Sequence, residues 1–211
     1  MTMQNVRVWT PEEPSDRRVE SVTVMKLGRD GAGVLSAGGE RLMLPVTEMA
    51  RPVEVGDSFY ALSDEYGMVS TADPELLVLL LDGIVPEVRT GAVRVMGAAR
   101  IPGVRMKLMV APTEEGVQAL PPIIGKGAVR VRDLAASIGD DRIDVVNWSE
   151  DRVQAAIAGF APARAQSGED LGDSIVLQFE EGQMHSALGK SGSNVRLVSA
   201  LLGCPIELEA V

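Results

Sequence analysis

The spacing of apolar and polar residues predicts a small β-rich part near the beginning of the chain. Between residues 21 and 71, short apolar runs are separated by glycine or charged turns, and each run is typical of a β-strand. Five strands in so short a segment indicate a five-stranded barrel of the OB type, a fold that often binds oligonucleotides. The five runs read SVTVMKL, GAGVLSA, ERLMLPV, DSFYAL and YGMVST.

Mixed helical and strand-like segments follow this part. Residues 73–88, DPELLVLLLDGIVPEV, predict one helix that joins the barrel to the rest of the chain. From there to the C-terminus one order of elements occurs twice: helix, strand, strand, helix, glycine turn, helix, strand. The second copy begins with the helical run EDRVQAAIAGF at residues 150–160. We therefore predict an α/β multidomain (α+β) fold, with a barrel followed by two mixed units.

An internal repeat supports this division. Residues 125–139 align with residues 189–203, 64 positions later, without a gap over 15 positions. Each segment then leads into a β-rich run, RIDVV at 142–146 and PIELEA at 205–210. Matched turns, helices and strands imply two copies of one supersecondary unit. The six identical pairs are Gly125/Gly189, Lys126/Lys190, Val131/Val195, Arg132/Arg196, Ala136/Ala200 and Gly139/Gly203.

The letters Gly-Lys-Ser at 189–191 raise the question of a nucleotide phosphate site. The phosphate-binding loop G-x-x-x-x-G-K-[ST] needs a glycine five positions before Gly189, and that position is Met184. What remains is a G-x-x-G turn between two predicted helices, the layout with which KH modules clamp a single-stranded nucleic-acid backbone. Taken alone, the turn also fits an ordinary helical hairpin. The repeat favours the KH interpretation.

Composition argues against catalysis and metal binding. The single cysteine, Cys204, has no disulfide partner and is expected to pack in the core, and the single histidine, His185, excludes His-based triads and most zinc sites. Carboxylates do not pair at a spacing that favours acid–base chemistry. We expect no catalytic residue, no metal site and no cofactor. The longest apolar run, Leu76–Leu81, is too short to span a membrane, and no signal peptide is visible, so we expect a cytoplasmic protein without a membrane partner.

The charge balance opposes simple nucleic-acid binding. The chain carries a net charge of −10, of which residues 1–85 contribute −7 (7 basic against 14 acidic) and residues 86–211 contribute −3 (13 against 16). Phosphate neutralisation supplies most non-specific affinity for nucleic acids. Two interpretations stay open for the second part, a local basic track or a solvated face of mixed charge. The basic residues concerned are Arg100, Arg105, Lys107, Lys126, Arg130 and Arg132 near the first glycine loop, with Lys190 and Arg196 near the second.

Aromatic residues are scarce, at 3% of the chain, although barrels that bind oligonucleotides usually stack bases on aromatic rings. Phe59 and Tyr60 are neighbours on one predicted strand. Because side chains alternate along a strand, one ring points into the barrel and the other points outward.

The order barrel, helix, KH, KH resembles the RNA-binding core of the NusA family of bacterial transcription elongation and termination factors. The resemblance is dense from about residue 73 to the end and fainter, but in order, over residues 19–72. RIDVVNWSED at 142–151 has no generic explanation and is the most specific match. The other matching stretches are DPELLVLLLDGIVPEV, ARIPGVRMKLMVA and ALGKSGSNVRLVSALLG.

The resemblance implies two type II KH domains, each a three-stranded sheet with helices on one face, packed as one unit. It implies an N-terminal leader at 1–18, an OB-type (S1-like) barrel at 19–72, a first KH domain with its connector helix at 73–148, and a second KH domain at 149–211. Single-stranded RNA would cross both loops and continue toward the barrel. The implied RNA-binding residues are Gly125, Lys126, Gly127, Arg130, Arg132, Gly189, Lys190, Ser191, Gly192, Asn194 and Arg196.

Three departures from the family qualify these expectations. Ala128 stands where the family has the second glycine of the first loop, the barrel is short between its fourth and fifth strands, and the chain begins almost at the barrel. We therefore expect a short form without the polymerase-binding N-terminal domain, which leaves contact with RNA polymerase open. The leading hypothesis is a monomeric, non-enzymatic RNA-binding factor in transcription elongation, termination or antitermination. A ribosomal RNA processing or assembly factor, and a protein-interaction module with a degenerate RNA site, are the alternatives.

Overall fold

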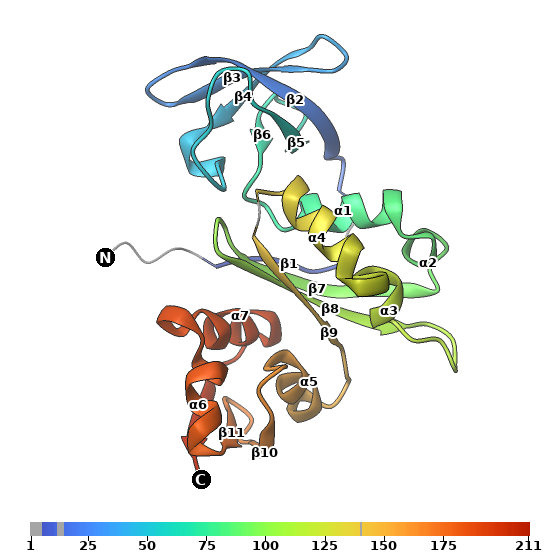
Figure 1. Cartoon of the computed structure of the whole chain (residues 1–211), viewed down its shortest axis with the longest axis vertical. Helices are drawn as coiled ribbons and strands as arrows, with labels where there is room; N and C mark the ends of the chain where they lie inside the picture. The colour runs from blue at the N-terminus through green and yellow to red at the C-terminus, as the bar shows by residue number, and fades with distance from the viewer. Residues whose placement is uncertain (1–5, 12–14, 140) are drawn as a thin grey trace.

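In the computed structural model, which describes residues 6–11, 15–139 and 141–211, the apolar runs of the first part form a five-stranded antiparallel barrel (Figure 1). The strand order is β4-β3-β2-β5-β6, and a bridge between Met43 and Met68 nearly closes it. Phe59 packs against the barrel core and Tyr60 is exposed, as the alternation predicted. The strands are β2 (Arg18–Leu27), β3 (Gly31–Ser36), β4 (Arg41–Pro45), β5 (Ser58–Ser63) and β6 (Val69–Ser70).

The connector after the barrel is two helices, α1 (Glu75–Ile84) and α2 (Pro86–Arg89), and the prediction of a single helix over 73–88 is wrong at this point. Val85 between them is extended, with φ −110° and ψ 104°. A proline disfavours the helical conformation in the residue before it, because its ring clashes with that residue's backbone. Pro86 therefore ends α1 and begins α2.

The first repeat, α1 to β9, contains strands β7 (Val93–Ile101), β8 (Arg105–Pro112) and β9 (Arg142–Asn147). Its helices α3 (Leu120–Ile124) and α4 (Val129–Ser137) are separated by a 3-10 turn over Lys126–Ala128. The second repeat has the same order with β11 and β12 parallel, as β8 and β9 are. Its elements are α5 (Arg152–Gly159), β10 (Ala165–Asp170), β11 (Ile175–Phe179), α6 (Glu181–Leu188), a 3-10 turn (Lys190–Gly192), α7 (Ser193–Leu202) and β12 (Ile206–Ala210).

The predicted fold class is confirmed, but the first sheet has four strands where three were expected. Strand β1 (Arg7–Trp9), in the predicted leader, pairs antiparallel with β7, with Trp9 opposite Ala98. Three residues carry too little periodicity to predict a strand, and their partner lies about ninety positions away in sequence. Residues 1–5 and 12–14 of the predicted leader lie outside the described residues. The domain boundaries themselves stay a prediction.

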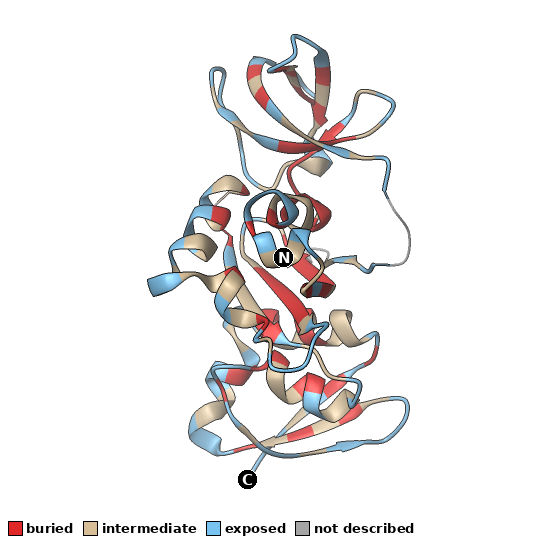
Figure 2. Ribbon diagram, turned by 90° about the vertical axis from the view of Figure 1, so that its right-hand side faces the viewer, coloured by how far each residue is buried: buried red, intermediate tan, exposed pale blue. Residues whose placement is uncertain are grey.

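The first sheet is buried on both faces, so the two repeats pack as one body (Figure 2). Met106, Leu108 and Val110 of β8 belong to a core shared with α1, α3 and α4. On the opposite face, Ala99 and Ile101 of β7 pack with Leu197 of α7. Because both faces of the sheet are covered, the second half of β7 and most of β8 are buried. Strands of this kind have near-continuous apolar sequences.

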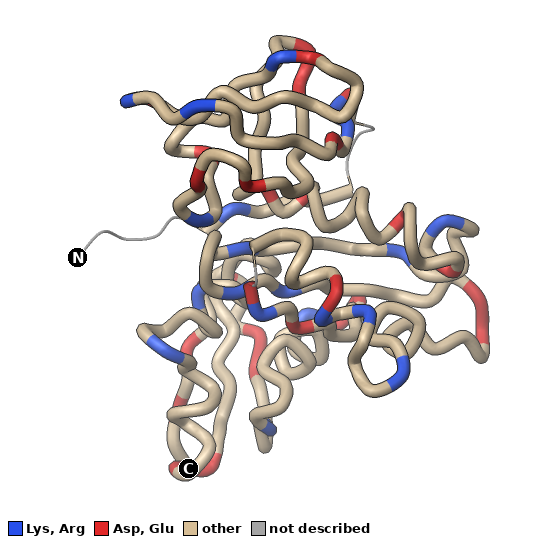
Figure 3. The backbone as a smooth tube through the Cα atoms, turned by 45° about the horizontal axis from the view of Figure 1, so that its top comes forward, with Lys and Arg blue, Asp and Glu red and all other residues tan. Residues whose placement is uncertain are grey.

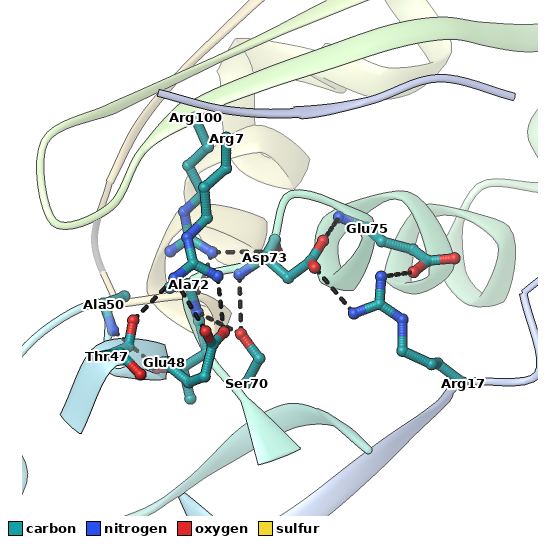
Figure 4. Close-up of polar contacts among 11 residues, drawn as sticks. Arg7, Arg17, Thr47, Glu48, Ala50, Ser70, Ala72, Asp73, Glu75 and Arg100 are labelled. Atoms are coloured by element: carbon teal, nitrogen blue, oxygen red, sulfur yellow. Dashed lines mark hydrogen bonds and ion pairs between the residues drawn. The ribbon is translucent and has the colours of Figure 1, made fainter. Parts of the chain in front are cut away.

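A buried arginine joins the barrel to the first repeat. The fully buried side chain of Arg100 donates to the Asp141 carboxylate (2.7 Å), to the Thr71 carbonyl (2.7 Å) and to the Ile138 carbonyl (2.7 Å). Partly buried pairs flank it, with Arg7 on Glu48 (2.6 Å) and Arg17 on Asp73 (2.8 Å) (Figure 4). One guanidinium thus holds the exit of the barrel, the end of α4 and the start of β9 together.

A second buried cation lies on the sheet face that looks toward the second repeat. The ammonium of Lys107 lies 3.1 Å from the Asp144 carboxylate, which also pairs with Arg105 and Arg142. Burial lowers the pKa of Lys107 from 10.5 to about 8, against the opposing effect of Asp144. Burial alone would raise the pKa of Asp144, but Lys107 and Arg105 together hold it below its usual value.

We predict that Arg100→Ala lowers the free energy of unfolding by about 3–5 kcal/mol, because it removes the buried cation from the Asp141 carboxylate and leaves the Thr71 and Ile138 carbonyls without this donor. Arg94→Ala, on the exposed side of the same strand, is the control and should change it by no more than about 0.5 kcal/mol. Urea unfolding followed by circular dichroism measures both. Equal effects of the two variants would show that the Arg100 contacts do not anchor the fold.

Lys107 should impose a pH dependence on stability. Between pH 8 and pH 10.5 the unfolded chain keeps the Lys107 proton that the folded protein has released, so the free energy of unfolding rises with pH across this window. Relative to Lys107→Met, the wild-type protein should gain on the order of 1–3 kcal/mol from the bottom to the top of the window. Urea midpoints across this range measure the gain, and parallel pH profiles for the two proteins would contradict the assignment.

Candidate nucleic-acid interface

Two glycine loops, each between a pair of helices, are the main features that the repeat creates. The first joins α3 to α4 and the second joins α6 to α7. Gly125 opens one with φ 74° and ψ 164°, and Gly189 opens the other with φ 70° and ψ 169°. A Cβ at Gly189 would lie 2.9 Å from the Cβ of Asn194, and one at Gly125 would lie 3.0 Å from the Cβ of Arg130. Both positions therefore require glycine, on grounds of conformation and of space.

The third and fourth residues of each loop are left-handed, and the loops differ in which of these two is glycine. Gly127 (φ 62°, ψ 25°) corresponds to Ser191 (φ 54°, ψ 32°). Ala128 (φ 60°, ψ 27°) corresponds to Gly192 (φ 70°, ψ 17°). The first loop thus has the same backbone as the second although its last glycine is replaced. No atom lies within 4 Å of a Cβ placed at Gly192, so by analogy Ala128 adds left-handed strain rather than a clash.

Each loop ends at the N-terminus of a helix of nine or ten residues, α4 or α7. The first backbone N–H groups of a helix have no partner within the helix, and its dipole is positive at this end. The side chains of Lys126 and Lys190 are exposed beside these N-termini. The first N–H of α4 donates to the Lys126 carbonyl and that of α7 donates to the Lys190 carbonyl. The positive helix end and the exposed lysine beside it together suit an anionic group such as a phosphate.

Two predicted site residues at equivalent positions hold the loops from inside. Arg130, partly buried, donates to the Pro122 carbonyl in α3. Asn194, 1% exposed, donates through its side-chain amide to the Ala187 carbonyl in α6 (2.9 Å). Each side chain thus ties the second helix of its pair back to the first. Arg132 is exposed and donates to the Gly127 carbonyl (2.8 Å), while Arg196, at the equivalent position of α7, is partly buried.

The hypothesis of a basic track along the strands is wrong for its strand residues. Arg100 and Lys107 are fully buried, and the side chain of Arg105 is 12% exposed, since all three pair with Asp141 or Asp144 between packed elements. The described surface intersperses positive and negative residues (Figure 3). At the loops, the side chains of Lys126 and Arg132 are exposed beside the first and that of Lys190 is exposed beside the second.

A groove beside the first loop was not predicted from the sequence. This groove, about 630 Å³ in volume, is lined by Glu87 of α2, by Pro121 and Pro122 of α3, and by the loop and α4. Val129, 49% exposed at the first position of α4, gives it an apolar side. An apolar residue directly after a glycine turn was the only signal, and it matched the core pattern of a helix equally well.

Cys204 is buried in the core of the second repeat, as expected. Over residues 6–11, 15–139 and 141–211, His, Cys, Asp and Glu side chains form no group of three that could hold a metal ion. Within the same ranges, every helix is too short or too polar to span a membrane.

Comparison with known proteins agrees with this geometry. Residues 71–148 match the family model described as the NusA-like first KH domain. The transcription termination/antitermination protein NusA of Thermus thermophilus is 32% identical over 144 residues, which are 67% of this chain and 37% of that protein. The NusA proteins of Borreliella burgdorferi and Mycoplasma genitalium are 27% and 29% identical over 67% and 64% of this chain. A solved structure titled "Crystal structure of APE1850" matches at 20% identity with a TM-score of 0.47, over 63% of this chain and 95% of that one.

The chain spans a quarter to two fifths of the length of these relatives, 37%, 30% and 26% respectively. The matches to the three proteins extend over about two thirds of this chain and are wider than the first KH domain alone. With two G-x-x-G loops in one backbone conformation and a family-model match at the first of them, the chain belongs to the NusA family.

Proposed function

We propose that this protein is a non-enzymatic factor that binds single-stranded RNA and acts on nascent transcripts in elongation, termination or antitermination. The observation that carries the proposal is the pair of glycine loops with one backbone conformation, each followed by a helix N-terminus and flanked by an exposed lysine. The relatives named above are termination/antitermination proteins, which supports the transcriptional role. RNA and, as a further proposal, RNA polymerase or another transcription factor are its partners in the cytoplasm.

In this mechanism each loop holds a backbone phosphate, and the groove beside the first loop holds the neighbouring bases. The loop N–H groups and Lys126 or Lys190 contact the phosphate, and the small residues at 127–128 and 191–192 let the RNA approach the backbone. Arg130 and Asn194 act indirectly, because they fix the loops. The proposed RNA-binding set is Gly125, Lys126, Gly127, Arg130, Arg132, Gly189, Lys190, Ser191, Gly192, Asn194 and Arg196.

The acidic body limits how this protein binds RNA. With a net charge of −10 and the strand cations buried, only a few phosphates are neutralised at the loops. The dependence of affinity on salt grows with the number of neutralised phosphates. We therefore expect affinity to fall with salt, but less steeply than for a basic RNA-binding protein.

One observation favours the alternative of a protein-interaction module. A groove of about 580 Å³ on the barrel is lined by Met25, Met68 and Tyr66, and the last of these is 80% exposed. Flexible methionine side chains adapt to apolar partners. This alternative predicts that RNA binds nowhere on the protein, which the next experiment tests.

Reversing charge at the second loop should abolish most RNA binding. Lys190→Asp/Ser191→Asp replaces a cation and a hydroxyl with two carboxylates, and lost charge-assisted contacts of this kind weaken binding by about 10- to 100-fold. Fluorescence anisotropy with short single-stranded RNAs at two salt concentrations measures the loss. The control is Arg29→Asp/Ala37→Asp, which makes the same change in charge at exposed barrel turns. Equal binding by both variants, or none by the wild type, would overturn the proposal.

Ala128→Gly should stabilise the protein by about 1 kcal/mol, because glycine adopts the left-handed conformation without the strain of a Cβ. Gly192→Ala, at the equivalent position of the second loop, should destabilise it by a similar amount. Urea unfolding measures both. In the Lys190→Asp/Ser191→Asp background, where the first loop binds alone, Ala128→Gly should also raise RNA affinity. A fall in affinity would contradict a backbone approach at this residue.

A further inference from the structure

A small cleft between the barrel and the first repeat has no part in the site described above. Its volume is about 170 Å³. Arg51 and Tyr60 contribute from the barrel side, and Ala136 and Ser137 contribute from the last turn of α4. Tyr60 is 44% exposed and Arg51 is exposed. The part of the chain that the structure describes places no carboxylate within ion-pair distance of Arg51.

The two walls of the cleft are held at a fixed separation by the Arg100 contacts. On the barrel side, the Ala50 backbone N–H donates to the Thr71 hydroxyl (2.9 Å), and the Thr71 carbonyl accepts from Arg100 (2.7 Å). On the opposite side the Ile138 carbonyl at the end of α4 accepts from the same guanidinium (2.7 Å). Figure 4 shows Ala50 and Arg100 within this network. The cleft is therefore formed before any ligand arrives, which lowers the entropic cost of binding.

Its chemistry matches one nucleotide. An exposed tyrosine ring offers a face on which a base stacks, and the guanidinium of Arg51 suits the attached phosphate. The last turn of a helix leaves carbonyl groups without donors from within the helix, and these can accept from the amino groups of a base. The same helix end carries partial negative charge, which disfavours a phosphate there and puts the base, rather than the phosphate, against α4.

The cleft lies on the route that RNA would take from the first loop. Helix α4 has nine residues, so loop and cleft are about 13 Å apart along its axis. Arg132 and Ala136 are one helical turn apart on one face of α4. Arg132 is exposed, and Ala136 lines the cleft. Three exposed cations follow this route from the loop to the barrel: Lys126, Arg132 and Arg51. The strand residues Arg100 and Lys107 cannot contact RNA in this way, because they are buried.

We propose that this cleft binds one nucleotide, with the base stacked on Tyr60 and the phosphate held by Arg51, and that the nucleotide belongs to the RNA strand held by the first glycine loop. The assignment of RNA as the source rests on the proposed function. A free mononucleotide has the same chemistry, and a separate arm of the experiment distinguishes it.

The test uses single-stranded RNAs of about four nucleotides, the length that one KH loop clamps, and longer RNAs that extend past the loop. Each longer RNA carries a single 2-aminopurine, moved one position at a time, because the fluorescence of this base is quenched when it stacks. Tyr60→Ala should abolish the quenching at one position and weaken the longer RNAs by roughly 5- to 150-fold, the range for loss of one base–aromatic stack. Arg51→Ala should weaken them as well. Neither variant should affect the short RNAs.

Tyr66→Ala and Arg29→Ala are matched controls, because each removes an exposed barrel residue of the same type away from the cleft. If the longer RNAs bind in a manner that depends on the loops, but no position responds to Tyr60→Ala, the cleft proposal fails while the proposed function stands. If no RNA binds, 2-aminopurine ribonucleoside monophosphate is titrated instead. Saturable quenching lost in Tyr60→Ala then supports a mononucleotide site, and its absence overturns the proposal.

Discussion

Strands β7 and β8 are packed on both faces, and the rest of the molecule is arranged around their burial. Helices α1, α3 and α4 cover one face of this sheet. Helix α7 of the second repeat covers part of the other face, so the sheet holds the two repeats together. Arg100 brings a charge into this apolar layer and uses its donors on a carboxylate and two carbonyls. A buried charge is tolerated only when such contacts are complete. Barrel exit, α4 and β9 are consequently fixed to one another.

This arrangement gives the two loops their common form. Each repeat places two helices against its sheet. The turn between them begins with a glycine, and its third and fourth residues are left-handed. One side chain on the second helix, Arg130 or Asn194, ties it to the end of the first. The sequence varies at the left-handed residues while the backbone does not. The positive N-terminal ends of α4 and α7, with the lysine beside each, are the part of the loops that is suited to a phosphate.

Much of this could be predicted because its signals are local. Alternating apolar runs gave the barrel strands, the aligned segments gave the repeat, and glycines at fixed spacing gave the loops. Features that depend on distant contacts could not be predicted. Strand β1 forms only because β7 offers an open edge, and Arg100 and Lys107 look like surface cations until the carboxylates of Asp141 and Asp144 fold against them. The helix break before Pro86 has a local signal, the proline itself, but the apolar run on both sides of it also fits one continuous helix.

The central claim is that both glycine loops hold the backbone of single-stranded RNA. The most direct test is a titration of the isotope-labelled protein with a short single-stranded RNA, followed by nuclear magnetic resonance of the backbone amides. The account predicts that the largest shifts occur at Lys126–Ala128, at Lys190–Gly192 and in the first turns of α4 and α7. Shifts confined to the barrel groove around Met25 and Tyr66, or no shifts at saturating RNA, would contradict it.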